Sequence, residues 1–137
     1  MQVLYRHSDQ SEKSVEFWQI FLLRTCIYSL FILHCSLTDF LSEEIIEQKR
    51  DTTIPKQLLR SGTSVGANIN ETVYGNSKAD FISKLHISLK EVNESIYWLT
   101  LLQRTNLYEY DYTKLLVLAG EIKKMLIASL NTAKGNK

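Results

Sequence analysis

The sequence QLLRSGTSVGANINE (residues 57–71), together with the segment that ends in ESIYWLTLL (94–102), decides the fold. The first part is rich in small residues, which let two helix backbones approach closely. The second part belongs to an apolar stripe with alternating spacings of three and four residues, the pattern of a helix that packs along one face. That stripe consists of Ile82, Leu85, Leu89, Val92, Ile96, Leu99 and Gln103. Both features describe helix packing, and neither supplies a reactive group.

The composition indicates one all-α domain. A chain of 137 residues with only 5 Gly and 1 Pro has too few turn residues for a sandwich or barrel. Apolar spacing and turn residues predict helices over about 14–48, 55–74, 78–104 and 111–132, with flexible tails at 1–12 and 134–137. Because the loops are short, neighbouring helices should be antiparallel. We therefore expect an up-down-up-down four-helix bundle over 13–133.

Several residues predict where the helices begin and end. In chain order they are Pro55 at the first position of the second helix, Gly75-Asn76 as its stop, Ser77 with Asp80 as a near capping box, Asn106 as the next stop, and Asp111 as the cap of the last helix. An ion pair between Asp80 and Lys84, four residues apart, should support the third helix.

Residues 17–37 are apolar enough to require a choice between a membrane helix and a buried helix. Arg24 and His34 interrupt this run, and a charge near the centre of a bilayer costs about 2.5–3.5 kcal/mol. Acidic residues precede the run, which disfavours a signal peptide. Cys26 and Cys35 would lie on opposite faces of one helix and cannot bridge each other. We expect a cytoplasmic protein with reduced thiols and a buried first helix rather than a membrane protein.

No pattern of catalytic or metal-binding residues is present in the sequence. His7, His34 and His86 are far apart and lack partners at metal-site spacing, and no nucleophile, base and orienting group can be named together. The glycines at 62 and 66 do not match a phosphate-binding loop. We therefore predict no enzyme activity, no cofactor, no metal and no small-molecule substrate.

The small-residue segment is interpreted instead as a helix-packing motif. Gly62 and Gly66 are four residues apart, so both lie on one face, where a second helix could approach. Arg60 could contact RNA, although a structural role is favoured; Glu71 lies about three turns further along the same face. The full motif comprises Arg60, Ser61, Gly62, Thr63, Ser64, Gly66, Asn68 and Glu71.

The charge distribution offers one weak candidate for nucleic-acid binding. Residues 1–54 carry 5 basic and 8 acidic groups, whereas residues 55–137 carry 11 and 7. The pI of 7.7 is well below the value above about 9 that is typical of a dedicated nucleic-acid domain. The last helix has a modest basic face without interleaved aromatic residues, formed by Lys114, Lys123, Lys124 and Lys134.

Three segments carry a resemblance to a known family: KQLLRSGTSVGANI (56–69), SKADFI (77–82), and LKEVNE (89–94) with the following YWL (97–99). They resemble the bacterial four-helix-bundle proteins first described as products of intervening sequences in large-subunit ribosomal RNA genes. The resemblance implies a homopentamer without known enzymatic activity. The chain is also similar to the accessory protein of diversity-generating retroelements, a basic pentameric barrel that works with a reverse transcriptase and nucleic acid.

These observations lead to two expectations for function. The first is a non-enzymatic homo-oligomeric bundle, with five copies by resemblance, that acts as a scaffold for RNA or a ribonucleoprotein. Apolar stripes beyond the needs of a single protomer favour self-association. The second is a protein–protein interaction module that binds no nucleic acid and is linked to a mobile element.

Overall fold

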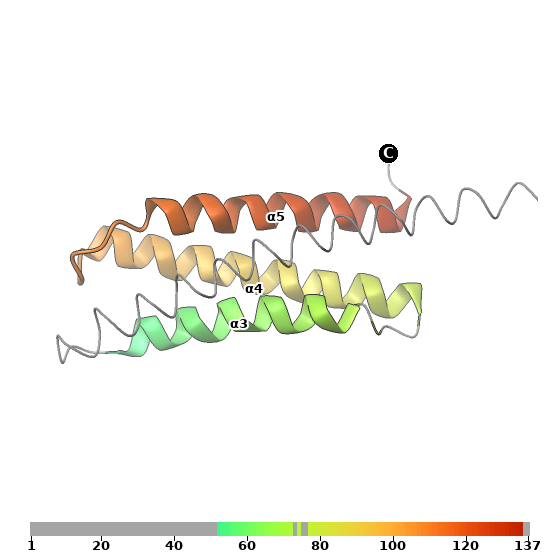
Figure 1. The fold of residues 1–137 in the computed structure, drawn as a ribbon, viewed down its shortest axis with the longest axis horizontal. Coiled ribbons are helices and arrows are strands. Elements are labelled where there is room, and N and C mark those ends of the chain that lie inside the picture. The colour runs from blue at the N-terminus through green and yellow to red at the C-terminus, as the bar shows by residue number, and fades with distance from the viewer. Residues whose placement is uncertain (1–51, 73, 75–76, 136–137) are drawn as a thin grey trace, which may run out of the picture.

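The computed structural model describes residues 52–72, 74 and 77–135. These residues form three helices, α3 (Thr53–Thr72), α4 (Lys78–Thr105) and α5 (Thr113–Lys134), and contain no strand. Figure 1 shows that the three helices run in alternating directions and that α4 lies between α3 and α5. The described part of the chain is therefore all-helical, as expected. The helix expected over 14–48, with its cysteines, and the tail at 1–12 lie outside the described residues.

Helix α3 begins earlier than the position of its proline suggested. The backbone N–H of Lys56 donates to the carbonyl of Thr52 at 3.1 Å, so Pro55 is the third helical residue and not the first. The first four N–H groups of a helix have no partner within the helix. Proline at this position therefore removes no hydrogen bond. The stop expected at Gly75-Asn76 lies outside the described residues.

Both ends of α4 follow the sequence prediction. Ser77 is extended (φ −157°, ψ 160°), and its side chain accepts a hydrogen bond from the backbone N–H of Asp80 at 3.2 Å. Asn106 adopts the left-handed conformation (φ 47°) and donates its N–H to the carbonyl of Leu102 at 3.1 Å. Each residue satisfies a backbone group that the end of the helix leaves unpaired.

Helix α5 begins and ends later than expected. Asp111 is not its N-cap, because Tyr112 occupies the position before Thr113, without a side-chain cap. The Asp111 carboxylate instead accepts the N–H of Thr113 at 3.0 Å. The side-chain and then the backbone hydrogen bond of Thr113 hold the pKa of Asp111 below its ordinary value, since both stabilise the charged form. At the other end Lys134 is still helical and Gly135 is the left-handed cap (φ 72°), so the predicted tail starts too early.

The core lies between the helices along their apolar stripes. In α4, Leu85, Val92 and Leu99 are fully buried, and the other apolar members of the predicted stripe are half-buried. Gln103 is exposed, and Leu102 takes the buried position in the last turn. The remaining buried apolar residues are Leu58, Val65 and Ile69 of α3, Leu115, Ala119, Ile122, Leu126, Leu130 and Ala133 of α5, and Tyr108 and Tyr112 of the connection between α4 and α5. The two tyrosines show that this connection closes one end of the core.

Candidate functional site

A pair of buried serines joins α3 to α4. The hydroxyl oxygens of Ser61 and Ser95 are 2.8 Å apart, although the residues are 34 positions apart in the chain. Ser61 also reaches the carbonyl of Leu58 (3.1 Å) and Ser95 that of Glu91 (3.0 Å). Two hydroxyl hydrogens serve three contacts, so one serine donates to the other while the second donates to its own helix. Both side chains are buried without an unsatisfied polar group.

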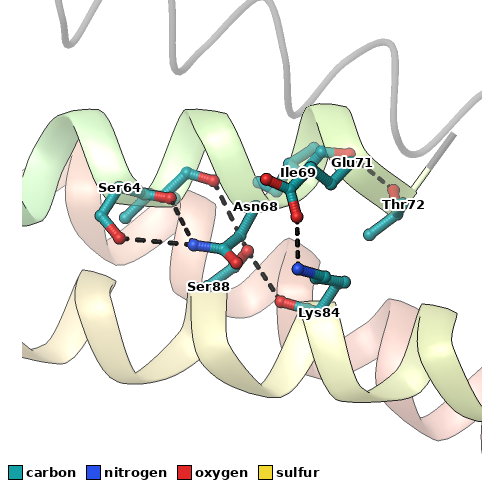
Figure 2. Close-up of polar contacts among 8 residues, drawn as sticks. Ser64, Asn68, Ile69, Glu71, Thr72, Lys84 and Ser88 are labelled. Atoms are coloured by element: carbon teal, nitrogen blue, oxygen red, sulfur yellow. Dashed lines mark hydrogen bonds and ion pairs between the residues drawn. The ribbon is translucent and has the colours of Figure 1, made fainter. Parts of the chain in front are cut away.

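Ser88 repeats this arrangement one heptad earlier on α4. Its hydroxyl donates to the carbonyl of Lys84 at 3.0 Å and points toward the carbonyl of Val65 on α3, 3.5 Å away (Figure 2). Ser88 and Ser95 are seven residues apart and therefore lie on one face of α4. Neither serine belongs to the predicted packing motif, although their seven-residue spacing is visible in the sequence.

An ion pair closes the outer edge between the same two helices. Lys84 pairs with Glu71 of α3 (Figure 2). The hydrogen bond with Glu71 is the largest cause of the raised pKa of Lys84; partial desolvation opposes it, and the charges of Glu71 and Asp80 add to it. The expected pair between Asp80 and Lys84 is therefore wrong as a contact. Glu71 is engaged by Lys84 and not by Arg60, because three helical turns separate the last two.

The other polar residues of the predicted packing motif for which hydrogen bonds are described form them within α3. Asn68 donates from Nδ2 to the carbonyl and the hydroxyl of Ser64, at 2.9 and 3.3 Å. Thr63 donates to the carbonyls of Leu59 and Arg60 within its own helix. Arg60 and Thr63 are exposed. Of the eight predicted residues, only Ser61 and Glu71 form a hydrogen bond or an ion pair with α4 among the described residues.

The two glycines of the motif do not have the same role. Gly62 is buried. Gly66 is half-buried, and a Cβ added there would meet no atom within 4 Å. The expectation that Gly66 permits a close helix approach is therefore wrong. The close contact that the structure does show between α3 and α4 is the hydroxyl pair of Ser61 and Ser95, 2.8 Å apart.

The outward side of α5 carries a second stripe with spacings of three and four, here called the α5 outer stripe. Its members are Val117, Gly120, Lys124, Ile127 and Asn131. Val117 is 58% exposed and Ile127 is 40% exposed, and a Cβ on Gly120 would meet nothing within 4 Å. These positions lie away from the buried residues of α5. The stripe therefore offers apolar surface that no described residue covers.

The four lysines predicted as a basic face are spread around α5. At about 100° per residue, Lys123 and Lys134 lie within about 20° of each other, whereas Lys114 lies about 180° from Lys123. Lys124 belongs to the α5 outer stripe. Lys123 is half-buried, and the other three are exposed. The four lysines therefore do not form one continuous face of α5.

Neither a metal cluster nor a membrane helix is found in the described part of the chain. Within residues 52–72, 74 and 77–135, no group of three or more His, Cys, Asp and Glu side chains comes together. None of the three described helices has the length and apolarity needed to cross a membrane. His7, His34 and the apolar residues 17–37 lie outside this range.

The comparisons with known proteins agree on one family. The family model described as 23S rRNA-intervening sequence protein matches residues 35–128. The chain is also similar to a crystal structure of a protein of unknown function from the S23 ribosomal protein family of Bacteroides thetaiotaomicron. The two share 38% identity with a TM-score of 0.71, over 80% of this chain and 98% of the other. No curated protein matches the chain.

Proposed function

Because the chain belongs to the 23S rRNA-intervening sequence protein family, we propose that it is a non-enzymatic helical scaffold that assembles with copies of itself and holds an RNA or ribonucleoprotein partner. The observation that carries the proposal is the exposed α5 outer stripe. Val117 and Ile127 leave apolar side chains in water on a helix whose other side is buried. Burying them against a second copy is favourable because it removes apolar surface from water.

The proposed assembly is a closed ring of four-helix bundles in the cytoplasm. Five copies are proposed from the family resemblance, which also includes the pentameric retroelement accessory protein. In a closed ring each protomer buries its α5 outer stripe once, against a different surface of the neighbouring copy. Both the family model and the structural neighbour carry descriptions that refer to ribosomal RNA or ribosomal proteins, which supports an RNA-containing partner.

Light-scattering mass measurement tests the assembly. We expect the wild-type protein to have five times the 15.9 kDa protomer mass, before and after nuclease treatment. The double variant Val117→Glu/Ile127→Glu should have a smaller mass, because charges at an apolar interface oppose its burial. Ile87→Glu is the matched control, since Ile87 is a comparably exposed apolar residue on α4 (37%).

Two results would contradict this assembly. A wild-type protein that remains a single protomer at high concentration would exclude self-association. Dissociation by Ile87→Glu, with Val117→Glu/Ile127→Glu still assembled, would place the interface on another helix. Nucleic acid that accompanies the purified protein and is removed by nuclease would support the RNA partner; a protein partner without nucleic acid would favour the interaction-module function.

A further inference from the structure

The outward side of α4 presents two cations and an aromatic ring in a row. Lys90, Tyr97 and Arg104 are spaced by seven residues, so they lie within about 40° around the helix and are about 10.5 Å apart along it. All three are exposed, and Tyr97 retains 59% of its surface. They lie on the side of α4 away from Leu85, Val92 and Leu99, which are buried.

The Tyr97 ring is supported by its neighbours. Its centroid lies 4.9 Å from that of Trp98, with an angle of 70° between the ring planes. Trp98 is half-buried and donates from Nε1 to the Glu94 carboxylate at 3.2 Å. Trp98 is thereby held on both sides. The exposed tyrosine rests against a fixed ring, which favours a flat stacking surface with little loss of side-chain freedom on binding.

The charges near this row favour an anion. The acidic residues of α4 are Asp80, Glu91 and Glu94. Asp80 and Glu91 lie about 100° and 120° around the helix from Tyr97. Glu94 is nearer, about 60° away, and keeps its charge, but the hydrogen bond from Trp98 holds its carboxylate beside Trp98, on the other side of Glu94 from Lys90 and Arg104. Lys90 and Arg104 therefore dominate the ends of the row.

We propose that Lys90, Tyr97 and Arg104 form a binding site for single-stranded RNA. Tyr97 stacks on an unpaired base, and the two cations bind phosphates on either side. The site identifies where the RNA partner of the proposed function binds, and it rests on that function. The α5 outer stripe and this row belong to different helices, so the row is not part of the stripe proposed for self-association.

Single-stranded RNA fits this surface better than a duplex or a protein does. Bases in a duplex are already stacked and paired, so they cannot reach a tyrosine on a convex helix face. A protein that buried Tyr97 would need a contiguous apolar patch. The residues within about 40° of Tyr97 along the row are Lys90, Asn93, Leu101 and Arg104, and of these only Leu101 is apolar, and it is half-buried. The row of about 21 Å matches a strand of a few nucleotides.

Fluorescence anisotropy with a labelled oligouridine of about 15 nucleotides tests the site on the full-length protein. Tyr97→Ala should weaken binding by at least about fivefold, while Tyr97→Phe keeps the ring and the affinity. Tyr74→Ala is the matched control, because Tyr74 is 77% exposed but lies outside α4. The double variant Lys90→Gln/Arg104→Gln should make the slope of log affinity against log salt shallower by about 1.4.

The outcomes separate this site from the proposed function. If Tyr97→Ala binds like wild type while Lys123→Gln/Lys124→Gln loses binding, the site on α4 is overturned and an RNA partner remains. If the wild-type protein does not bind the oligouridine, the site and the RNA part of the proposed function both fall. Equal affinity for a labelled duplex would overturn stacking on Tyr97. Assembly mass, measured in parallel, decides the scaffold independently.

Discussion

The two flanks of α4 solve the packing problem differently. On the flank that meets α3, the buried positions include Ser88 and Ser95, whose hydroxyls reach toward the facing helix. On the flank away from α3, Leu89 and Ile96 are half-buried and pack against the apolar core. One flank therefore uses short side chains and hydrogen bonds, and the other uses larger apolar surface.

This difference has consequences for specificity. Apolar packing tolerates changes that conserve volume. A hydroxyl pair requires both partners at the correct distance, since hydrogen bonds weaken steeply outside a narrow range of geometry. We infer that the serine flank fixes the register of α3 on α4. The fully buried apolar residues between the two flanks, together with the apolar flank, supply most of the stability.

The largest expected effect comes from the centre of the core, between the two flanks. Leu99 is fully buried. Leu99→Ala should reduce the free energy of unfolding by about 2–5 kcal/mol, because it loses transfer free energy and leaves a cavity. Urea unfolding followed by circular dichroism measures it. Leu89→Ala, on the half-buried flank, is the control and should cost less; an equal or larger cost would mean that the apolar flank carries the stability.

A larger side chain on the serine flank should have the next largest effect. Ser95→Leu places three carbon atoms where a hydroxyl lies 2.8 Å from that of Ser61, so we expect a loss of about 1–3 kcal/mol from overpacking. Ile96→Leu, a volume-conserving change on the next residue and the other flank, should cost less. If the two variants unfold at the same urea concentration, the flanks do not differ as described.

The apolar stripe and both ends of α4 were predictable because their signals are local. Leu85, Val92 and Leu99 follow helical spacing, and Ser77 and Asn106 are typical capping residues in typical positions. The family resemblance was also visible in the sequence, because it rests on continuous runs of residues such as 56–69. The α5 outer stripe also follows helical spacing and was therefore visible in the sequence. The four lysines were grouped because they share one helix, and their angles around that helix were not taken into account.

The burial of Ser88, Ser95, Tyr108 and Tyr112 was not predicted, because a pattern of apolar and polar residues assigns polar groups to the surface. Ser88, Ser95 and Ser129 each donate to the carbonyl four residues earlier, so each enters the core with a partner from its own helix. Tyr108 and Tyr112 are buried in a connection, where no helical periodicity applies. These positions depend on tertiary contacts that one sequence does not display.

The hydroxyl pair itself should have a smaller effect that a double-mutant cycle can isolate. Ser61→Ala and Ser95→Ala each remove one partner, yet the remaining serine can still donate to its own helix. The coupling energy between the two sites should be about 0.5–1.5 kcal/mol in favour of the wild-type pair. Ser61→Ala with Ser129→Ala is the control cycle, because no hydrogen bond joins them, and it should give additive effects. Equal coupling in both cycles would show that the Ser61–Ser95 contact is not specific.

The smallest effect should come from the pair of half-buried Lys84 with exposed Glu71, which differs from the hydroxyl pair in its response to salt and pH. Lys84→Met keeps the length of the side chain and removes its charge, so thermal stability should fall slightly at low salt and little at high salt, where exposed charges are screened.

The folded-state pKa of Lys84 is raised above 10.5. Its contribution is therefore complete below pH 10.5 and is lost as the pH rises through the raised value. Melting temperatures of wild type and Lys84→Met should converge on that alkaline side, whereas the Ser61–Ser95 coupling should not change with salt. A difference between wild type and Lys84→Met that persists at high salt would mean that Lys84 contributes through the packing of its aliphatic chain, and the edge between α3 and α4 would then resemble the apolar flank.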